Sequence, residues 1–374
     1  MRILFVTASS GSKGGGELYL LKLAQGLSRL GHSLALACAK HIRMDRLSES
    51  FEEYGEVFRI DYTNTYDLPG KSLHYLVSPK AFFPDLENAV AQWNPDILHL
   101  NKQNLEDALD LLKWFSLQKL PVVQTIHILR TPSELGARLG VFRNFVMKRS
   151  LQNWKIPTIL IASESERAAF EHNKIVRRSV SEHIPNGVAP LPNARKSLSL
   201  NPLKFVAISR LHQQKRPFLW LDWARQILEK IPNAQFAWIG DGPLESQFIE
   251  AIRARSLAQV EYHGWVSDPE RFINDSHYLM HSAAYEGQPF AILEALSAGL
   301  PVIADDALML SQSELNPAMI PINDVLADEA ILTNEELYSQ KNEEALRIYE
   351  SSYTLESMTS RTVDFYNRIV SEQY

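Results

Sequence analysis

Residues 2–39 have the sequence RILFVTASSGSKGGGELYLLKLAQGLSRLGHSLALACA, in which two apolar runs flank a glycine-rich loop and an amphipathic segment. Residues 2–8 and 33–39 are short continuous apolar runs, which are typical of strands buried in a parallel sheet. Residues 17–30 place apolar side chains at helical spacing, and Gly31 follows, where many helices end in glycine. This strand–helix–strand unit predicts a parallel sheet with helices on its faces.

The same order of elements recurs in the second half of the chain. Residues 203–209 (LKFVAIS) form a predicted strand, residues 218–231 a predicted helix, and residues 234–240 (AQFAWIG) another strand. The sequence therefore predicts an α/β fold with two doubly wound, Rossmann-like domains. Ligands of such sheets bind beyond the carboxyl ends of the strands, so two facing domains would form a central cleft.

The proline-rich segment 184–203 (IPNGVAPLPNARKSLSLNPL) is a predicted interdomain linker. It divides the chain into an N-terminal domain, residues 1–185, and a C-terminal domain, residues 186–354. Residues 355–374 form a final predicted helix. Its pattern leaves open whether it packs on the second domain or crosses back to the first.

Composition and charge exclude several classes of protein. The length of 374 residues is typical of two or three domains, and the net charge of −6 argues against general nucleic-acid binding. Cys38 is the single cysteine, which excludes a disulfide framework and a cysteine metal cluster and fits a cytoplasmic location. The N-terminus lacks the pattern of a signal peptide. Apolar runs of about 18 residues, as a membrane span requires, do not occur.

The glycine-rich loop, residues 11–16, precedes the first predicted helix, whose N-terminus could hold an anion. Its spacing, G-x-x-G-G-G, differs from the dinucleotide motif G-x-G-x-x-G. The following strand ends in CAKH, residues 38–41, without a carboxylate for a ribose diol. An NAD site is therefore disfavoured, whereas an NADP site and a plain flexible loop both stay open.

Polar residues also follow the predicted strands of the second half. Arg210 and Lys215 lie in the loop after the first of these strands, where two cations could offset the charge of a diphosphate. The alternative is a solvated surface pair. Gly240, in the turn IGDGP, allows close approach to a ligand or only a change of chain direction. Residues 263–268 (HGWVSD) could present backbone to a flat base.

The segment EGQPFAILE, residues 286–294, places two glutamates eight positions apart around a turn and a helix start. Gly287 and Pro289 interrupt the chain before the helix, and amides at a helix N-terminus favour an anion. Glu294 lies within the helix, where it could accept hydrogen bonds from a diol, and Glu286 lies before it. The spacing therefore predicts that one ligand is held at two hydroxyl-bearing ends and at a phosphate centre.

The chain resembles the retaining glycosyltransferases of family 4, which have the GT-B fold, in the motifs GGGELYLLKLAQGLSRLGHSL, IPNGV, SRLHQQK, IGDGP, HGWVSD and EGQPFAILEALSAGLPVIA. These motifs lie in the family's order within residues 14–304 and so cover most of the chain. The glutamate pair with EALSAGLPVI is the most specific of them, and the glycine loop is weak alone. The resemblance implies a hexosyltransferase that uses a nucleoside-diphosphate sugar, and UDP-glucose is favoured because it is common in this family.

The resemblance also implies that residues 1–185 form the acceptor-side domain and residues 186–354 the nucleotide-sugar-binding domain, and it assigns roles to individual residues. Arg210 and Lys215 would bind the donor pyrophosphate and stabilise the leaving diphosphate. Glu294 would hold the ribose, and Glu286 the hydroxyls of the donor sugar. His127 would lie beside the reacting sugar, unless it is an ordinary histidine at a strand end. The expected catalytic residues are therefore His127, Glu286, Arg210 and Lys215. The other expected nucleotide-sugar-binding residues are Gly15, Gly16, Asn186, Gly187, Gly240, Trp265, Val266, Gly287, Gln288, Pro289, Phe290, Ala291 and Glu294.

Two residues depart from the family pattern. Gln288 stands where relatives usually have an apolar aromatic residue, and Asn101 stands where many have a second histidine, at an end of the site expected to touch acceptor. The chain has no D-x-D motif, so a metal-independent enzyme without a cofactor is expected. A double displacement would need a carboxylate close to the anomeric carbon. Neither glutamate of the 286–294 segment is an obvious candidate, which favours departure and attack on the same face.

Residues 138–155 (RLGVFRNFVMKRSLQNWK) mix five cations with apolar and aromatic side chains. This segment could contact an anionic membrane at its inner face, or it could be a core helix with a basic outer face. The family implies an exopolysaccharide, lipid-linked or small-molecule acceptor. Two other functions stay open: a non-catalytic sugar-nucleotide-binding protein on the same fold, and a pyridoxal-phosphate phosphorylase, which needs a cofactor lysine and a longer chain.

Overall fold

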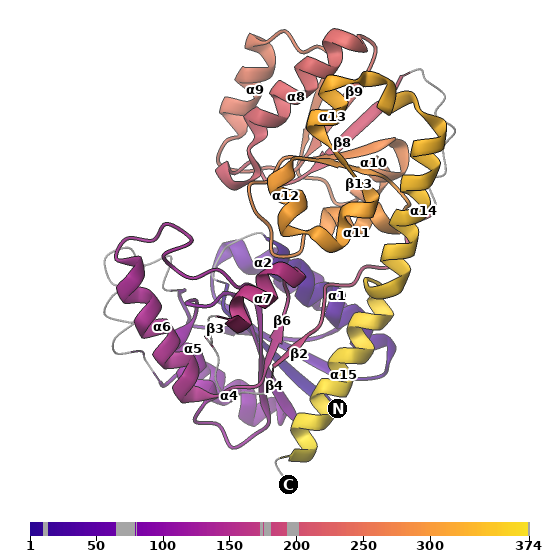
Figure 1. The fold of residues 1–374 in the computed structure, drawn as a ribbon. Coiled ribbons are helices and arrows are strands. Elements are labelled where there is room, and N and C mark those ends of the chain that lie inside the picture. Colours follow the sequence, from indigo (N-terminus) through magenta and orange to yellow (C-terminus); the bar gives the residue numbers. More distant parts are fainter. Residues whose placement is uncertain are drawn as a thin grey trace. The chain divides into compact units, whose positions relative to one another are not determined.

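The structure is a computed structural model, and its chain divides into two compact units. The first unit comprises Met1–Ala162, Glu166–Asn186 and Leu355–Tyr374, and the second comprises Ser163–Ser165 and Gly187–Thr354. Figure 1 shows both. The residues described are 1–9, 14–64, 79, 81–172, 175, 181–192 and 202–372. Part of the predicted linker and part of the glycine-rich loop, residues 11–13, therefore lie outside the described residues.

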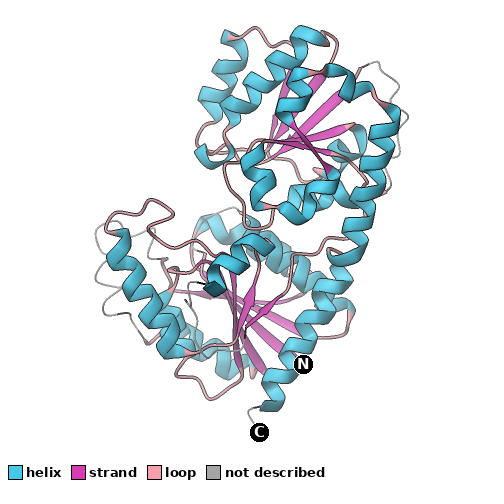
Figure 2. Ribbon diagram, in the orientation of Figure 1, coloured by secondary structure: helices cyan, strands magenta, loops and turns pink. Residues whose placement is uncertain are grey.

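The first unit is built on a seven-stranded parallel sheet in the order β3-β2-β1-β4-β5-β6-β7. Its strands are β1 Arg2–Thr7, β2 Ser33–Ala39, β3 Gly55–Ile60, β4 Ile97–Asn104, β5 Val122–Ile128, β6 Thr158–Leu160 and β7 Ser181–His183. Its helices are α1 Gly15–Arg29, α2 Asp45–Phe51, α4 Pro84–Trp93, α5 Leu109–Phe115, α6 Gly140–Trp154, α7 Glu164–His172 and α15 Leu355–Glu372, with the 3₁₀ turn η1 Ile42–Met44. Figure 2 shows helices flanking this sheet.

The second unit has a six-stranded parallel sheet in the order β10-β9-β8-β11-β12-β13. Its strands are β8 Lys204–Ile208, β9 Gln235–Ile239, β10 Val260–Gly264, β11 Tyr278–His281, β12 Val302–Ala304 and β13 Met319–Pro321. Its α-helices are α8 Pro217–Lys230, α9 Glu245–Ala254, α10 Glu270–Asp275, α11 Phe290–Ser297, α12 Asp306–Ser311, α13 Ile322–Ala327 and α14 Glu335–Ser352. Its 3₁₀ turns are η3 Gln213–Lys215, η4 Ser313–Ala318 and η5 Glu329–Thr333. The predicted class, two doubly wound parallel α/β sheets, is confirmed.

Each sheet has its own buried core, as strands covered on both faces require. In the first unit, β1 and β2 are buried from Ile3 to Val6 and from Leu34 to Ala39. In the second unit, the rings of Phe205 and Phe236 stack with centroids 4.7 Å apart on neighbouring strands. Such aromatic pairs add to the free energy gained by apolar burial.

In both sheets the strand order reverses at the first strand, and this determines where a ligand can bind. In the first unit β1 lies between β2 and β4, and in the second β8 lies between β9 and β11. Ligands of open α/β sheets bind at such switch points, beyond the carboxyl ends of the strands. The candidate residues should therefore follow β1, β4 and β5 in one unit, and β8 and β11 in the other.

The last helix, α15, belongs to the first unit and packs against α1. The chain leaves the first unit at Asn186 and returns to it at Leu355. Among the helices of the described residues, none combines the length and the apolar character that crossing a lipid bilayer requires.

Candidate functional site

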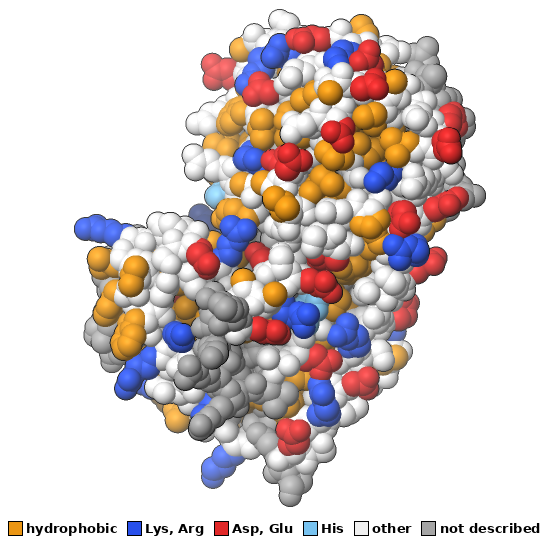
Figure 3. Space-filling model, in the orientation of Figure 1, with side chains coloured by type: hydrophobic (Ala, Val, Ile, Leu, Met, Phe, Trp, Pro, Cys, Tyr) orange, Lys and Arg blue, Asp and Glu red, His pale blue; other side chains and the backbone are white. Residues whose placement is uncertain are grey.

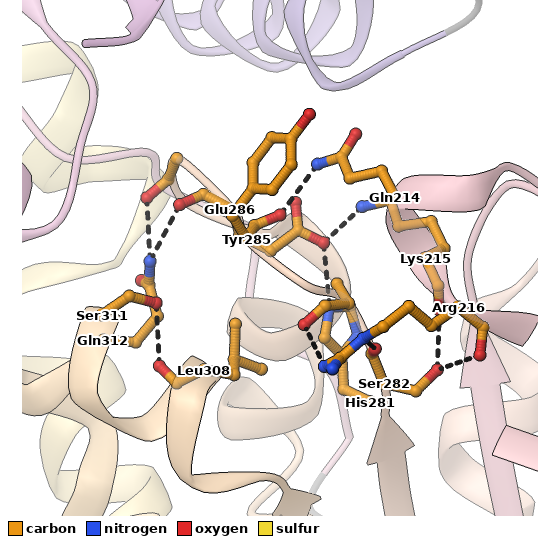
Figure 4. Close-up of polar contacts among 12 residues, drawn as sticks. Gln214, Lys215, Arg216, His281, Ser282, Tyr285, Glu286, Leu308, Ser311 and Gln312 are labelled. Atoms are coloured by element: carbon orange, nitrogen blue, oxygen red, sulfur yellow. Dashed lines mark hydrogen bonds and ion pairs between the residues drawn. The ribbon is translucent and has the colours of Figure 1, made fainter. Parts of the chain in front are cut away.

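In the second unit, three polar side chains meet beyond the carboxyl end of β11 (Figure 4). Lys215, the last residue of η3, forms an ion pair with Oε1 of Glu286, 71 residues away in the sequence. His281, the last residue of β11, donates from Nε2 to the same oxygen at 2.9 Å. Glu286 is only 7% exposed. The structure thus joins two of the predicted catalytic residues in one buried cluster.

The two partners of Glu286 determine its protonation state. Burial would raise the pKa of this carboxyl, but the charge of Lys215 and the hydrogen bond from His281 outweigh it and lower the pKa to about 2. Glu286 is therefore ionised at neutral pH and can only accept hydrogen bonds. The ionised state suits a residue that binds sugar hydroxyls, and it excludes a role for Glu286 as a general acid.

Arg216 supports the backbone beneath this cluster. Its Nε donates to the carbonyl of Ser282 at 2.6 Å, and its Nη2 donates to that of Ala283 at 2.9 Å and to Asp305 at 2.5 Å. Ser282 in turn donates from Oγ to the carbonyl of Lys215 at 2.7 Å. The segment after β11 is therefore tied to the segment that carries Lys215.

Two glutamines support the rest of the same segment (Figure 4). Gln214 donates to the carbonyl of Tyr285 at 2.8 Å. Gln312, which is fully buried, donates to the carbonyls of Glu286 and Gly287 at 3.2 and 3.1 Å. Side chains thus hold successive carbonyl groups of this segment, which limits its freedom and positions the Glu286 carboxylate.

The rest of the 286–294 segment leads directly into α11. Pro289 occupies the N-cap position without a side-chain cap, and the helix begins at Phe290. All eight residues of α11 are buried, including Glu294, which is 6% exposed. A helix N-terminus favours an anion because its amides point along the helix dipole. Gln288 is also buried, next to this N-terminus.

The other predicted residues of the second unit lie in two places. Arg210 follows β8 and is exposed, in contrast to the half-buried Lys215. The amide of Gly240 donates to the carbonyl of Gly264 at 2.6 Å, which brings the turn after β9 beside Trp265. Trp265 is 49% exposed and Val266 is half-buried.

In the first unit, a chain of hydrogen bonds links His127 to the start of α1. His127 lies near the end of β5, and its Nε2 is 2.7 Å from Oδ1 of Asn101 on β4. Nδ2 of Asn101 donates to the carbonyl of Gly16 at 3.0 Å. A Cβ atom at Gly16 would lie 2.1 Å from the side-chain amide of Gln103, so a larger residue here would have to displace that side chain. Gly15 is the first residue of α1.

Burial and geometry fix the state of His127. Burial lowers its pKa to about 3, so the ring is neutral at physiological pH. Because Asn101 donates its amide to Gly16, its oxygen must accept the proton from Nε2 of His127. Nδ1 of His127 is then an unprotonated acceptor, able to receive a hydrogen bond from a hydroxyl group.

A second polar network lies beneath His127, and sequence reasoning missed it. His99 on β4 bonds through Nδ1 to the hydroxyl of Tyr366 on α15, and through Nε2 to Thr125 Oγ1 at 2.7 Å. Thr125 is 3.2 Å from the hydroxyl of Tyr19, whose ring packs edge-on against His127. The signal was present: His99 and Thr125 are polar residues within buried strands, two residues before Asn101 and His127 respectively.

Sequence reasoning also missed residues of the second unit, namely Gln214, Arg216, His281, Ser282, Asp305 and Gln312. Their contacts join segments far apart in the chain, and only the alternation of polar and apolar residues could have indicated them. Asn186 and Gly187 are the residues at which the chain passes from one unit to the other, and Asn186 is buried. Among the described residues, histidine, cysteine, aspartate and glutamate side chains form no group of three that could hold a metal ion.

Solved structures share this fold along nearly the whole chain. The HepE protein of Anabaena in complex with UDP has a TM-score of 0.72 at 17% identity and matches 98% of this chain and 100% of that one. Sucrose-phosphate synthase of Thermosynechococcus elongatus has a TM-score of 0.73 at 17% identity, with 99% of both chains matched. These proteins place the chain in the GT-B-like class of folds.

Two family models match successive parts of the sequence. Residues 13–190 match the model described as Glycosyltransferase Family 4, and residues 192–314 match the model described as Glycosyl transferases group 1. The chain belongs to the family 4 glycosyltransferases.

Curated relatives match shorter parts. An uncharacterized glycosyltransferase of Methanocaldococcus jannaschii is 32% identical over 118 residues, 31% of this chain and 29% of that protein. The UDP-Gal:alpha-D-GlcNAc-diphosphoundecaprenol alpha-1,3-galactosyltransferase of Escherichia coli is 31% identical over 160 residues, 38% of this chain and 41% of that protein. The matched regions therefore span less than half of the length of these relatives.

Proposed function

We propose that this protein transfers a hexose from a nucleoside-diphosphate sugar to an acceptor hydroxyl, with retention of anomeric configuration. The observation that carries this proposal is the buried cluster of Lys215, Glu286 and His281 at the switch point of the second sheet. Family membership supports it. UDP-glucose is the favoured donor, because solved neighbours of the same fold contain UDP with glucose, or UDP-glucose.

Each charged residue of the second unit has a chemical task in this proposal. The diphosphate would bind Lys215 and Arg210, whose charges offset the negative charge that grows on the leaving group as the bond to the sugar breaks. Glu286, ionised and fixed in place, would accept hydrogen bonds from hydroxyls of the donor sugar. Glu294 would do the same for the ribose, and the N-terminus of α11 would face the phosphates.

The remaining expected residues take supporting roles. Gly240, Trp265 and Val266 would border the base, and the backbone of residues 287–291 would contact the phosphates and sugar. In the first unit, His127 would accept a hydrogen bond from a substrate hydroxyl through Nδ1, while Gly15 and Gly16 would allow close approach to a substrate.

The state of Glu286 also bears on how configuration is retained. A double displacement needs a carboxylate free to attack the anomeric carbon. Glu286 already accepts hydrogen bonds from Lys215 and His281 at one oxygen, which suits a binding role. We therefore favour departure and attack on the same face, in which the acceptor hydroxyl gives its proton to the leaving phosphate. The reaction so written uses no metal ion.

The acceptor we propose is a glycan or a lipid-linked glycan, used at the cytoplasmic face of the membrane. Relatives support this class by name: the E. coli protein acts on a diphosphoundecaprenol-linked sugar, and a Staphylococcus aureus relative, 24% identical over 170 residues, is a poly(ribitol-phosphate) alpha-N-acetylglucosaminyltransferase. That match covers 43% of this chain and 34% of the relative.

Thermal-shift measurements with UDP, GDP and ADP and their sugars test the donor, because a bound ligand raises the melting temperature by an amount that increases with its concentration and affinity. Two variants then separate the roles of the glutamates. Glu294→Ala should weaken both the bare nucleotide and the nucleotide sugar, since the ribose belongs to both. Glu286→Ala should leave nucleotide affinity nearly unchanged and mainly lower transfer.

Calorimetry with the selected nucleotide, beside single-turnover rates, measures both effects. Equal losses of nucleotide affinity in the two variants would contradict the division of roles. Tight nucleotide-sugar binding without turnover on any glycan or lipid-linked acceptor would favour a non-catalytic binding protein instead.

A further inference from the structure

The outer surface of α6 and the residue before it form an exposed apolar patch. Leu139, Val141, Phe142 and Phe145 are 57, 80, 46 and 64% exposed. We call these four residues the α6 patch. Figure 3 shows hydrophobic side chains gathered over this helix, with lysine and arginine side chains nearby. Single exposed apolar residues are ordinary, but four within seven positions are a feature to explain.

Contacts on the opposite side of α6 hold the patch outward. Arg143 reaches inward and donates from Nε to Glu106 at 2.7 Å, in an ion pair whose carboxylate side chain is 3% exposed. Met147 and Leu151, four and eight positions after Arg143, continue the buried side of the helix. Because these three residues share one helix face, the patch is fixed on the other face.

The backbone at the start of α6 is strained in a way that keeps Leu139 at the surface. Leu139 has a φ of 58°, a left-handed conformation that costs a non-glycine residue roughly 1–2 kcal/mol. Gly140 then packs so tightly that a Cβ atom there would lie 2.6 Å from Cα of Ser133. Ser133 also exchanges two hydrogen bonds with Asn144, at 3.1 and 2.6 Å. These contacts hold the start of α6, and with it Leu139, in one conformation.

The charges along residues 135–163 have one sign, with the exposed Glu134 just before this segment. Residues 135–163 contain no aspartate or glutamate, whereas the cations are Arg138, Arg143, Lys148, Arg149 and Lys155. Arg138 and Arg149 are exposed, and Lys148 is half-buried. By helical spacing, Lys148 and Arg149 continue the outer face that Val141, Phe142 and Phe145 begin. The sequence left open a core helix with a basic outer face. In the structure the outer face of α6 is apolar over its first turns and becomes basic only at Lys148 and Arg149.

We propose that the α6 patch inserts into the surface of an anionic lipid bilayer. Aromatic and aliphatic side chains would enter the boundary between headgroups and acyl chains, and Arg138, Lys148 and Arg149 would contact lipid phosphates. Charge complementarity supports a bilayer over a second copy of this chain, because two such patches would bring like charges together. The inference deepens the proposed function and rests on it for the lipid-linked acceptor. Binding of the α6 patch to a membrane does not itself require catalysis.

The test measures binding of the full-length protein to vesicles in the absence of donor and acceptor. Vesicles of phosphatidylcholine with about one third phosphatidylglycerol should bind the protein, and phosphatidylcholine alone should bind it ~10-fold or more weakly. Replacing Phe142 and Phe145 together by serine should lower the partition coefficient ~10- to 100-fold. Replacing Arg138 and Arg149 together by glutamine should lower it ~10-fold on anionic vesicles only.

Leu310→Ser is the matched control, since Leu310 is 76% exposed on α12 of the second unit. It should bind vesicles like the wild type. Circular dichroism and nucleotide-induced thermal shifts should not change in any of these variants. Absence of binding to anionic vesicles, or equal binding by the serine variant, would overturn the proposal without touching the transfer reaction. A dimer in sedimentation equilibrium that the serine variant abolishes would show that a second copy covers the patch and would also overturn it.

Discussion

Replacing Lys215 by methionine removes one charge of the Lys215–Glu286 pair and keeps the length of the side chain. Glu286 then stays buried beside His281 alone. The native lowering of its pKa, from 4.5 to about 2, corresponds to roughly 3 kcal/mol of preference for the ionised carboxylate. Without Lys215, burial dominates and the pKa of Glu286 should rise above its ordinary value. We therefore expect a loss of about 3–5 kcal/mol in the free energy of unfolding at pH 7, as for other broken buried pairs.

The pH dependence of this loss follows from linkage. Because the folded-state pKa of Glu286 is lowered, its contribution to stability is present above pH 4.5 and is lost as the pH falls towards 2. The difference between the wild type and Lys215→Met should therefore be largest near pH 7. It should shrink as the pH falls, first through the raised pKa of Glu286 in the variant and then from pH 4.5 towards 2 in the wild type. Urea unfolding followed by tryptophan fluorescence, repeated across this range, measures it.

A second substitution separates the stabilising role of Lys215 from its proposed catalytic role. In the Lys215→Met background, Glu286→Gln removes the unpaired charge and should restore most of the lost stability. Transfer should not recover, because the cation that faces the leaving diphosphate is still missing, at a cost of about 2–4 kcal/mol in the transition state, and the carboxylate for the donor sugar is missing as well. With the single Glu286→Gln variant, these proteins form a double-mutant cycle that gives the coupling energy of the pair.

Three outcomes would contradict this reasoning. A Lys215→Met variant with unchanged stability at pH 7 would show that the pair is not stabilising. A loss of equal size at pH 7 and pH 3 would show that packing, and not the charge of Glu286, is responsible. Normal turnover in either Lys215 variant would remove Lys215 from the proposed chemistry.

Further predictions concern the metal, the first unit and its last helix. Transfer should persist in EDTA, since the chain has no D-x-D motif; a loss that Mn²⁺ or Mg²⁺ reverses would refute this. Burial lowers the pKa of His127 to about 3, so the unfolded state takes up a proton on this ring at a higher pH than the folded state. This contribution to the stability of the fold is therefore fully present above pH 6.5 and is lost as the pH falls towards 3. His127→Gln should therefore flatten the pH dependence of the free energy of unfolding, by about 1.4 kcal/mol per pH unit between about pH 5.5 and 4; an unchanged slope would contradict a buried neutral ring. Tyr366→Phe should cost about 1–3 kcal/mol in urea unfolding, because His99 stays buried without this partner; a cost near zero would show that the bond is dispensable.

The fold could be predicted from local patterns, because each strand and helix carries its own periodicity. The runs at residues 2–8 and 33–39 became β1 and β2, and residues 203–209 and 234–240 contain β8 and β9. Right-handed crossovers and helices on both faces reduce the possible strand orders to a few. The position of the last helix could not be predicted in this way, because the amphipathic pattern of residues 355–374 fits any apolar surface.

The site was predictable only where a motif holds its residues close together in sequence. Glu286 and Glu294 share one segment, so their placement around the start of α11 follows from local structure. Their partners do not: His281 ends a strand, and Gln312 comes from a different part of the chain. Nothing in the sequence near Lys215 indicates that Glu286 is its partner, because that contact depends on the order of β8 and β11 in the sheet.

The return of the chain to the first unit reverses the expected order of folding during synthesis. Most of the first unit is synthesised early, but the helix that covers α1, with Tyr366 that bonds to His99, is synthesised after the second unit. Translation adds roughly 5–20 residues per second, so the first unit waits on the order of ten seconds or longer for its final segment. The second unit is complete at Thr354. A chain truncated after Thr354 and released from the ribosome should resist protease in residues 202–354 and be cut in the first unit, whose α1 would still be uncovered.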